Sequence, residues 1–245
     1  MFDLFPVTLG VWTFCAVAMF FGAIVQRLAG QGFGLIATPM LALVAPQLLP
    51  ASILLVGLVI GFASASIEMS AVAKDELPAG FAGRALGAVI AVWIATHIAQ
   101  TGGLAYLIAG MVYLGIVLSV LGLRVAIRPM TLFVAGVGGG IMGTLTAVGA
   151  PPMALLYQHE EQRRSAAMQN IFFAFGMIVS LGALGAVGLI TRQHLVFAVS
   201  LLPVVIVALY VAQPLAKHVA KSQIRPYALA LAGIAATILL LKQIL

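Results

Sequence analysis

The stretch GQGFGLIATPM, residues 30–40, interrupts a chain that is otherwise almost entirely apolar. Gly30, Gly32 and Gly34 follow one another closely, and Pro39 comes soon after them. Glycine lowers the stability of a helix interior, and proline removes a backbone hydrogen-bond donor. The stretch therefore predicts a break in the backbone of an apolar segment.

The surrounding chain has the composition of an integral membrane protein. Of its 245 residues, 63% are hydrophobic and 7% are charged, and the mean hydropathy is +1.20. Soluble domains carry about 25% charged residues, so this chain has too little charge to cover a water-facing surface. We expect the lipid bilayer to be its partner and expect no nucleic acid. In a membrane protein with a formal net charge of +6, the distribution of the basic residues among the loops indicates the membrane topology.

The pattern of apolar segments predicts an all-α, polytopic membrane protein. Most segments reach the length of about 20 residues that a spanning helix needs, and none alternates as the strands of a membrane barrel do. Two regions fit no ordinary span: 30–45, and 129–158 with its run GVGGGIMGTLTAVGAPPM. In each we predict a re-entrant or discontinuous helix near the membrane midplane, with non-helical backbone over 30–34 and 143–150.

The two unusual regions match each other when the sequence is shifted by 113 residues. The shift pairs Gly30 with Gly143, Ala37 with Ala150, Pro39 with Pro152 and Met40 with Met153. We therefore predict two homologous transmembrane repeats, 1–122 and 123–245, within one membrane domain. Internal repeats with interrupted segments at corresponding positions indicate the binding site of a transporter.

The positions of the basic residues favour inverted repeats. If each half crosses the membrane an odd number of times, ten basic residues share one face, and only Arg192 and Lys242 oppose them. The ten are Arg27, Lys74, Arg84, Arg124, Arg128, Arg163, Arg164, Lys217, Lys221 and Arg225. An even number of crossings makes the repeats parallel and divides the charges six against six. Because cytoplasmic faces are rich in Lys and Arg, we expect inverted repeats with both termini extracytoplasmic.

Paired breaks at membrane depth suit an anion. Broken helices leave free N–H groups and positive dipole ends where the backbone lines a cavity. The alternative is that the small residues only allow tight helix packing. The predicted substrate-binding residues are Arg27, Gln31, Gly32, Phe33, Gly34, Thr38, Thr146, Val148, Gly149, Ala150 and Asn170. For Arg27, anchoring the helix end at the cytoplasmic face is an equally good interpretation.

At the stretches GQGFGLIATPMLAL and GGGIMGTLTAVGAPPMALL the chain resembles the sulfite exporter TauE/SafE family, also called the toluene sulfonate uptake permeases. The resemblance covers nearly the whole chain in layout and repeat structure. It implies a transporter of small sulfur-containing anions, such as sulfite and organosulfonates, or of other organic anions. Gln31 and Phe33 stand where consecutive glycines are common in the family, which leaves the exact substrate open.

The leading functional hypothesis is a secondary transporter, with export preferred, for a small anion across the bacterial cytoplasmic membrane. A passive anion channel and a transporter of small carboxylates stay open as alternatives. The chain carries no HExxH or GxSxG motif and no GxxxxGK[ST] loop, so we expect neither an enzyme nor an ATP-driven pump. With one cysteine, Cys15, and no second histidine in helical register at HEEQRR, we expect no metal and no cofactor. The sequence leaves the coupling ion and a homodimer open.

Cysteine labelling tests the predicted topology. In a Cys15→Ser background, we expect an impermeant thiol reagent applied to whole cells to label Gln47→Cys and to leave Gln223→Cys unlabelled. The reason is that inverted repeats place residue 47 outside and residue 223 in the cytoplasm. Labelling of Gln223→Cys without labelling of Gln47→Cys contradicts the inverted arrangement.

Overall fold

The computed structural model describes residues 7–67, 69–98, 103–215 and 221–244. Ten α-helices and no strand occur among these residues, which confirms the predicted all-α fold. The helices are α1 (Leu9–Ala29), α2 (Phe33–Val44), α3 (Ala51–Ile67), α4 (Leu77–Ile98), α5 (Leu104–Val120), α6 (Pro129–Thr146), α7 (Pro151–Tyr157), α8 (Gln162–Ala186), α9 (Arg192–Leu215) and α10 (Lys221–Ile244). Short 3-10 helices cover Pro46–Leu48, Met69–Ala71 and Lys74–Glu76.

Five helical segments of the described chain are long and apolar enough to cross a membrane. They are Leu9–Ala29, Lys74–His97, Pro129–Thr146, Gln162–Ala186 and Arg192–Leu215. Shorter apolar helices include α2, which follows the first predicted break, whereas α7 after the second break has only seven residues. Length and composition therefore identify a multi-pass membrane protein.

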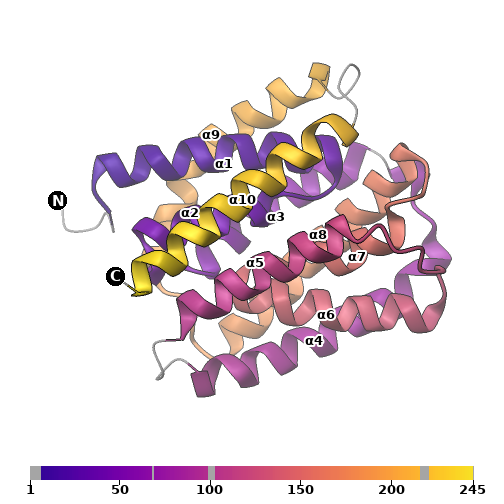
Figure 1. Cartoon of the computed structure of the whole chain (residues 1–245), viewed down its shortest axis with the longest axis horizontal. Helices are drawn as coiled ribbons and strands as arrows, with labels where there is room; N and C mark the ends of the chain where they lie inside the picture. The colour runs from indigo at the N-terminus through magenta and orange to yellow at the C-terminus, as the bar shows by residue number, and fades with distance from the viewer. Residues whose placement is uncertain (1–6, 68, 99–102, 216–220, 245) are drawn as a thin grey trace.

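Corresponding helices of the two halves have corresponding neighbours. The 113-residue shift relates α1–α5 to α6–α10 in chain order. In Figure 1, α4 lies along α6 at one side of the molecule, and their counterparts α9 and α1 also pack together. The counterparts α3 and α8 pack against each other, as do α5 and α10. Exchanging the halves thus turns the α4–α6 pair into the α9–α1 pair and turns the other two pairs into themselves.

The first predicted break lies between α1 and α2. Gly30 has φ 72° and Gly32 has φ 127°, both in the region that favours glycine. Phe33 and Gly34, which we expected within the break, already form the first turn of α2. Pro39 lies inside that helix. The break is therefore shorter than the run of glycines and proline predicts.

The second predicted break lies between α6 and α7. Residues 143–146, also expected to be non-helical, still belong to α6, and residues 147–150 connect it to α7. Ala147 has φ 60°, a left-handed conformation in which α6 ends. Pro151 and Pro152 open α7, where the missing N–H costs no helix hydrogen bond. Residues 147–150 correspond to 34–37, so the two breaks are offset by about one helical turn.

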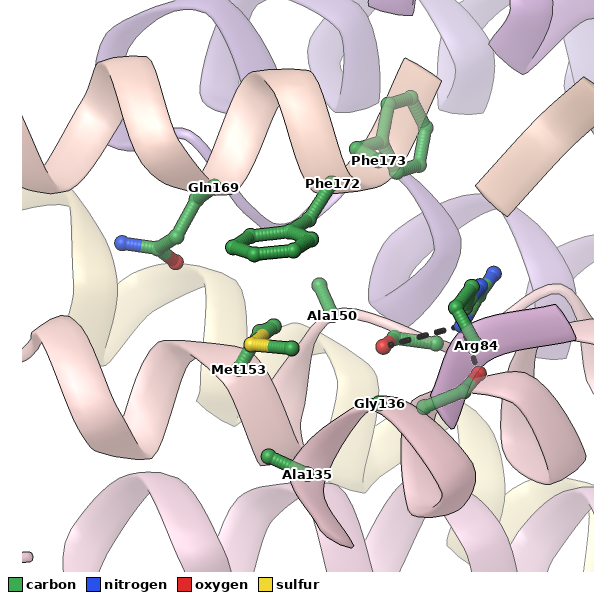
Figure 2. A pocket seen from close by; sticks show the side chains of 10 residues that line it. Arg84, Ala135, Gly136, Ala150, Met153, Gln169, Phe172 and Phe173 are labelled. Carbon is green, nitrogen blue, oxygen red and sulfur yellow. Dashed lines mark hydrogen bonds between the residues drawn. The ribbon is translucent and has the colours of Figure 1, made fainter. Parts of the chain in front are cut away.

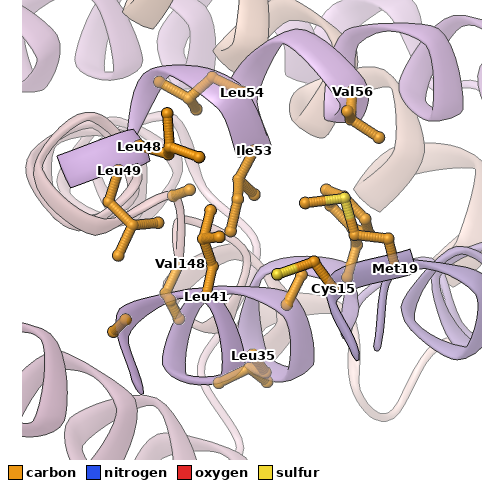
Figure 3. Close-up of a cluster of buried hydrophobic side chains, with 14 of the residues drawn as sticks. Cys15, Met19, Leu35, Leu41, Leu48, Leu49, Ile53, Leu54, Val56 and Val148 are labelled. Atoms are coloured by element: carbon orange, nitrogen blue, oxygen red, sulfur yellow. The ribbon is translucent and has the colours of Figure 1, made fainter. Parts of the chain in front are cut away.

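The two breaks touch each other in the interior. A Cβ atom on Gly34 would overlap the Ala147 carbonyl oxygen and lie 3.3 Å from the Val148 Cα. Only glycine therefore permits this approach of α2 to the second break. Apolar side chains surround the junction, and Figure 3 shows Leu35, Leu41 and Val148 in one cluster with others from α1 and α3.

The start of α4 corrects one sequence prediction. We expected Arg84 in a cytoplasmic loop, but α4 begins at Leu77, after Glu76, and includes Arg84. Glycines at positions 83 and 87 of α4 face backbone carbonyls of α6, and Gly136 and Gly140 of α6 face backbone of α4. The two helices pack closely for this reason, and Arg84 is buried between them with 5% exposure.

Alanine at Gly34 tests the contact between the breaks. Because the added methyl group meets fixed backbone, we expect Gly34→Ala to lower the free energy of unfolding by about 1–3 kcal/mol, the usual cost of overpacking. The measurement is thermal unfolding of the purified protein in detergent. Gly182→Ala in α8 is the control, since a Cβ there meets no atom within 4 Å. Equal melting temperatures for Gly34→Ala and wild type contradict the described contact.

Candidate functional site

Two cavities flank residues 149–150 of the second break and share Gly149, Ala150 and Phe173. The first, here called the Arg84 cavity, is lined by Arg84, Ala135, Gly136, Gly139, Gly149, Ala150, Met153, Gln169, Phe172 and Phe173 (Figure 2). The second, the break cavity, is lined by Gln26, Gly32, Gly34, Leu35, Ala147, Val148, Gly149, Ala150, Pro151 and Phe173. The broken backbone thus borders two small spaces.

Arg84 is the one charged side chain of the described chain that lines either of the two cavities. Its Nη1 donates to the carbonyl oxygen of Gly139 and lies 3.5 Å from that of Gly149. Its Nε atom is buried and has no partner within the described part of the chain. The described residues also give Arg84 no carboxylate partner. Figure 2 shows the guanidinium at one end of the cavity and Gln169 toward the other.

Glycines make the space that Arg84 occupies. A Cβ atom on Gly143, Gly149 or Gly176 would overlap atoms of the guanidinium group. These glycines come from α6, the second break and α8, so three elements surround the same side chain. A larger residue at any of them would have to displace the guanidinium, which links the position of Arg84 to the course of the second break.

Gln26 satisfies the backbone at the first break. Its Nε2 donates to the Gly30 carbonyl at 2.8 Å, and its Oε1 accepts from the Phe33 N–H at 3.3 Å. The same Nε2 lies 3.1 Å from Oδ1 of Asn170 in α8. Gln26, Phe33 and Asn170 are fully or almost fully buried. Gln26 therefore joins both ends of the first break to a helix of the other half.

Thr146 has the same role at the second break. Its hydroxyl donates to the Met142 carbonyl at 2.8 Å and accepts from the Val148 N–H at 3.3 Å. The N–H groups of Phe33 and Val148, which we predicted as donors to a substrate, thus donate to protein side chains in this conformation. The backbone donors still predicted for a substrate are those of Gly32, Gly34, Gly149 and Ala150.

The structure gathers part of the predicted site in one place. Gly32, Gly34, Val148, Gly149 and Ala150 all line the break cavity. Arg27 lies in the last turn of α1 and is 7% exposed, but it lines neither cavity.

Three of the predicted side chains carry buried polar atoms without a hydrogen-bond partner among the described residues. These atoms are Oε1 of Gln31, Oγ1 of Thr38 and Nδ2 of Asn170. Buried polar atoms are paired in most proteins, so such atoms indicate a bound water or ligand.

Both cavities are small. The Arg84 cavity leaves about 20 Å³ to the centre of a water-sized sphere, which is room for about one water molecule. The break cavity leaves none. An anion with several oxygen atoms enters only if the walls separate, so the described conformation has no room for such an anion.

Sequence reasoning missed Arg84, Gln26 and Phe173. The available signal for Arg84 was its position within GFAGRALG, where glycines at 80, 83 and 87 mark a close-packed helix face. Gln26 is an uncharged polar residue inside the first span, which is costly unless it has partners. Phe173 is an aromatic residue in an apolar helix and gave no signal of its own.

The Sulfite exporter TauE/SafE family model matches residues 15–239. The chain belongs to the TauE/SafE sulfite exporter family. No curated protein and no solved structure matches it. Membership confirms the resemblance carried by the two glycine-rich stretches. It makes the protein a membrane transporter of the sulfite and sulfonate type, a family of transporters and not of enzymes.

Replacing Arg84 by a neutral side chain of similar length distinguishes a ligand-binding role of Arg84 from a structural role. Burying an ion costs several kcal/mol, whereas leaving a carbonyl group without its donor costs about 1–3 kcal/mol. We therefore expect Arg84→Met to melt at the same temperature as the wild type or higher, in the absence of anions. A large fall in melting temperature would show instead that Arg84 mainly holds α4, α6 and the second break together.

Proposed function

We propose that the protein is a secondary transporter that exports a small anion, sulfite or an organosulfonate, across the bacterial cytoplasmic membrane. The single observation that carries this proposal is the buried guanidinium of Arg84 beside the second break, without a carboxylate partner among the described residues. The proposed site extends from Arg84 through Gly149 and Ala150 to the start of α2 at Gly32 and Gly34.

The electrostatics of this site favour an anion. Burying an ion without a counter-charge raises the free energy of the protein. A bound anion offsets part of this desolvation cost by pairing with the guanidinium group. A guanidinium group presents planar donors that match the oxygens of sulfite and sulfonate groups. The N-terminus of α2 adds positive potential, with a helix terminus equivalent to about half a charge. Together, Arg84 and the N-terminus of α2 supply positive potential in a region where the membrane spans contain few charged residues.

The proposed site has polar groups near the first break and apolar side chains beside Arg84. Asn170 lines neither cavity, but it bonds to Gln26 of the break cavity, and its buried Nδ2 is a donor without a partner among the described residues. On the Arg84 side, Met153, Phe172 and Phe173 give an apolar wall. The polar groups suit the oxygens of the anion, and the apolar side chains suit the carbon chain of an organosulfonate.

Alternating access follows from the contacts between the halves. We propose that 1–122 and 123–245 are inverted repeats with both termini extracytoplasmic. The contacts that would change during transport are Gln26 with Asn170 and Gly34 with Ala147. Each joins one half to the other at the junction of the breaks, so rocking of the halves would open the site to one side at a time.

A thermal-shift screen of the purified protein tests the site. We expect sulfite, or one of taurine, isethionate and sulfoacetate, to stabilise the wild type by about 2.7 kcal/mol at 100 times its Kd. Sulfate and small carboxylates are the comparison ligands. We expect Arg84→Met to lose this stabilisation and Arg84→Lys, which keeps the charge but not the planar donors, to keep part of it.

Uptake of the same anion into proteoliposomes completes the test. Arg192→Met is the matched control, because Arg192 is an exposed arginine at the start of α9, and we expect it to transport like wild type. Wild-type transport by Arg84→Met would place the site elsewhere. Unitary currents in a planar bilayer would identify a channel instead of a carrier, and stabilisation by carboxylates alone would change the substrate class.

A further inference from the structure

An apolar groove lies between α5, α6 and α7, outside the two cavities of the transport site. It encloses about 510 Å³. Its walls are Met111, Leu114, Leu118, Val125, Met130, Thr131, Val134, Ala135, Gly138, Ile141, Met142, Pro152, Leu155 and Leu156. Thr131 is the one polar side chain among them. Leu114, Met130 and Val134 are 44%, 71% and 60% exposed, so the groove is open along its length.

The corresponding place in the other half lies between α1, α2 and α10. There α10 packs along α2 and also contacts α1, and Lys242 Nζ donates to the Leu43 carbonyl at 3.0 Å. The counterpart helix α5 contacts α7 and α6 less extensively. The groove is thus bounded by the helices with the less extensive contacts.

The groove has the length of one lipid leaflet. Along α6 its walls run from Met130 to Met142, a distance of about 18 Å at the helical rise of 1.5 Å per residue. Half of the hydrocarbon core of a bilayer is about 15 Å thick. An acyl chain that lies in the groove therefore reaches from the end of α6 to about the middle of the membrane.

Two arginines stand at one end of the groove. Arg124 adjoins Val125, and Arg128 precedes α6 just before Met130. Both are exposed, and neither forms an ion pair with an acidic residue of the described chain. Arginine recognises phosphate through paired hydrogen bonds. Two positive charges at this end of the groove favour a headgroup with net negative charge over a zwitterionic headgroup, which carries its own positive charge beside the phosphate.

We propose that the groove binds one acyl chain of an anionic phospholipid whose phosphate group lies on Arg124 and Arg128. The chain would pack against Pro152 and Leu155 of α7, the short helix that follows the second break. This inference does not depend on the identity of the transported anion.

Native mass spectrometry of the purified, delipidated full chain tests the proposal with phosphatidylglycerol and phosphatidylcholine of identical acyl chains. We expect phosphatidylglycerol to bind roughly 30-fold more tightly, the factor for two basic residues near a lipid headgroup. The double substitution Arg124→Gln and Arg128→Gln should remove this preference. Both residues are exposed, so the variant should keep its fold. Equal binding of the two lipids by wild type would overturn the proposal.

A second variant tests the acyl chain separately. A Cβ on Gly138 would lie 3.5 Å from Pro152, an ordinary contact, so Gly138→Leu should fill the groove and reduce binding of both lipids at least tenfold. Gly182→Leu is the matched control on an open surface of α8. Unchanged phosphatidylglycerol binding by Gly138→Leu would overturn the proposal. A wild-type dimer that Gly138→Leu converts to a monomer would also overturn it, because a second copy would then cover the groove.

Discussion

Backbone that leaves a helix in an apolar interior must find new hydrogen-bond partners, and this requirement organises the whole centre of the molecule. At the first break, Gln26 accepts from one side of the gap and donates to the other. At the second, Thr146 caps an N–H group, and Arg84 donates to carbonyls on α6 and at Gly149. The polar residues of the site therefore provide the hydrogen bonds that two helix breaks need inside a membrane.

The two breaks use partners of different charge. A neutral amide supports the first, whereas a guanidinium supports the second, and the position related to Arg84 by the repeat is the buried Phe197. Since a carbonyl group needs only a neutral donor, an arginine is more than the backbone requires. Its charge costs more to bury than an amide does. The excess is explained if the second break also receives an anion, which is why Arg84 anchors the proposed site.

The sequence was informative about the breaks and poor about their partners. Glycine and proline act on the local backbone, so the runs at 30–40 and 143–152 predicted both interruptions to within a few residues. Arg84 was misplaced because a charge near the end of an apolar segment has the same sequence pattern as an interfacial anchor. Only the start of α4 at Leu77 and the glycines of α6 and α8 reveal that it is buried, and both depend on long-range packing.

The carbonyl contacts of Arg84 also bear on release of the substrate. When the site holds no anion, the Gly139 and Gly149 carbonyls partly satisfy the guanidinium, so the empty state is not an unpaired ion. An arriving anion gains only the difference between its own hydrogen bonds and these. Binding is therefore weaker than the charge alone would give, since only differential interactions contribute to affinity. A carrier needs that balance, because an anion held by an otherwise unsatisfied buried arginine would leave too slowly.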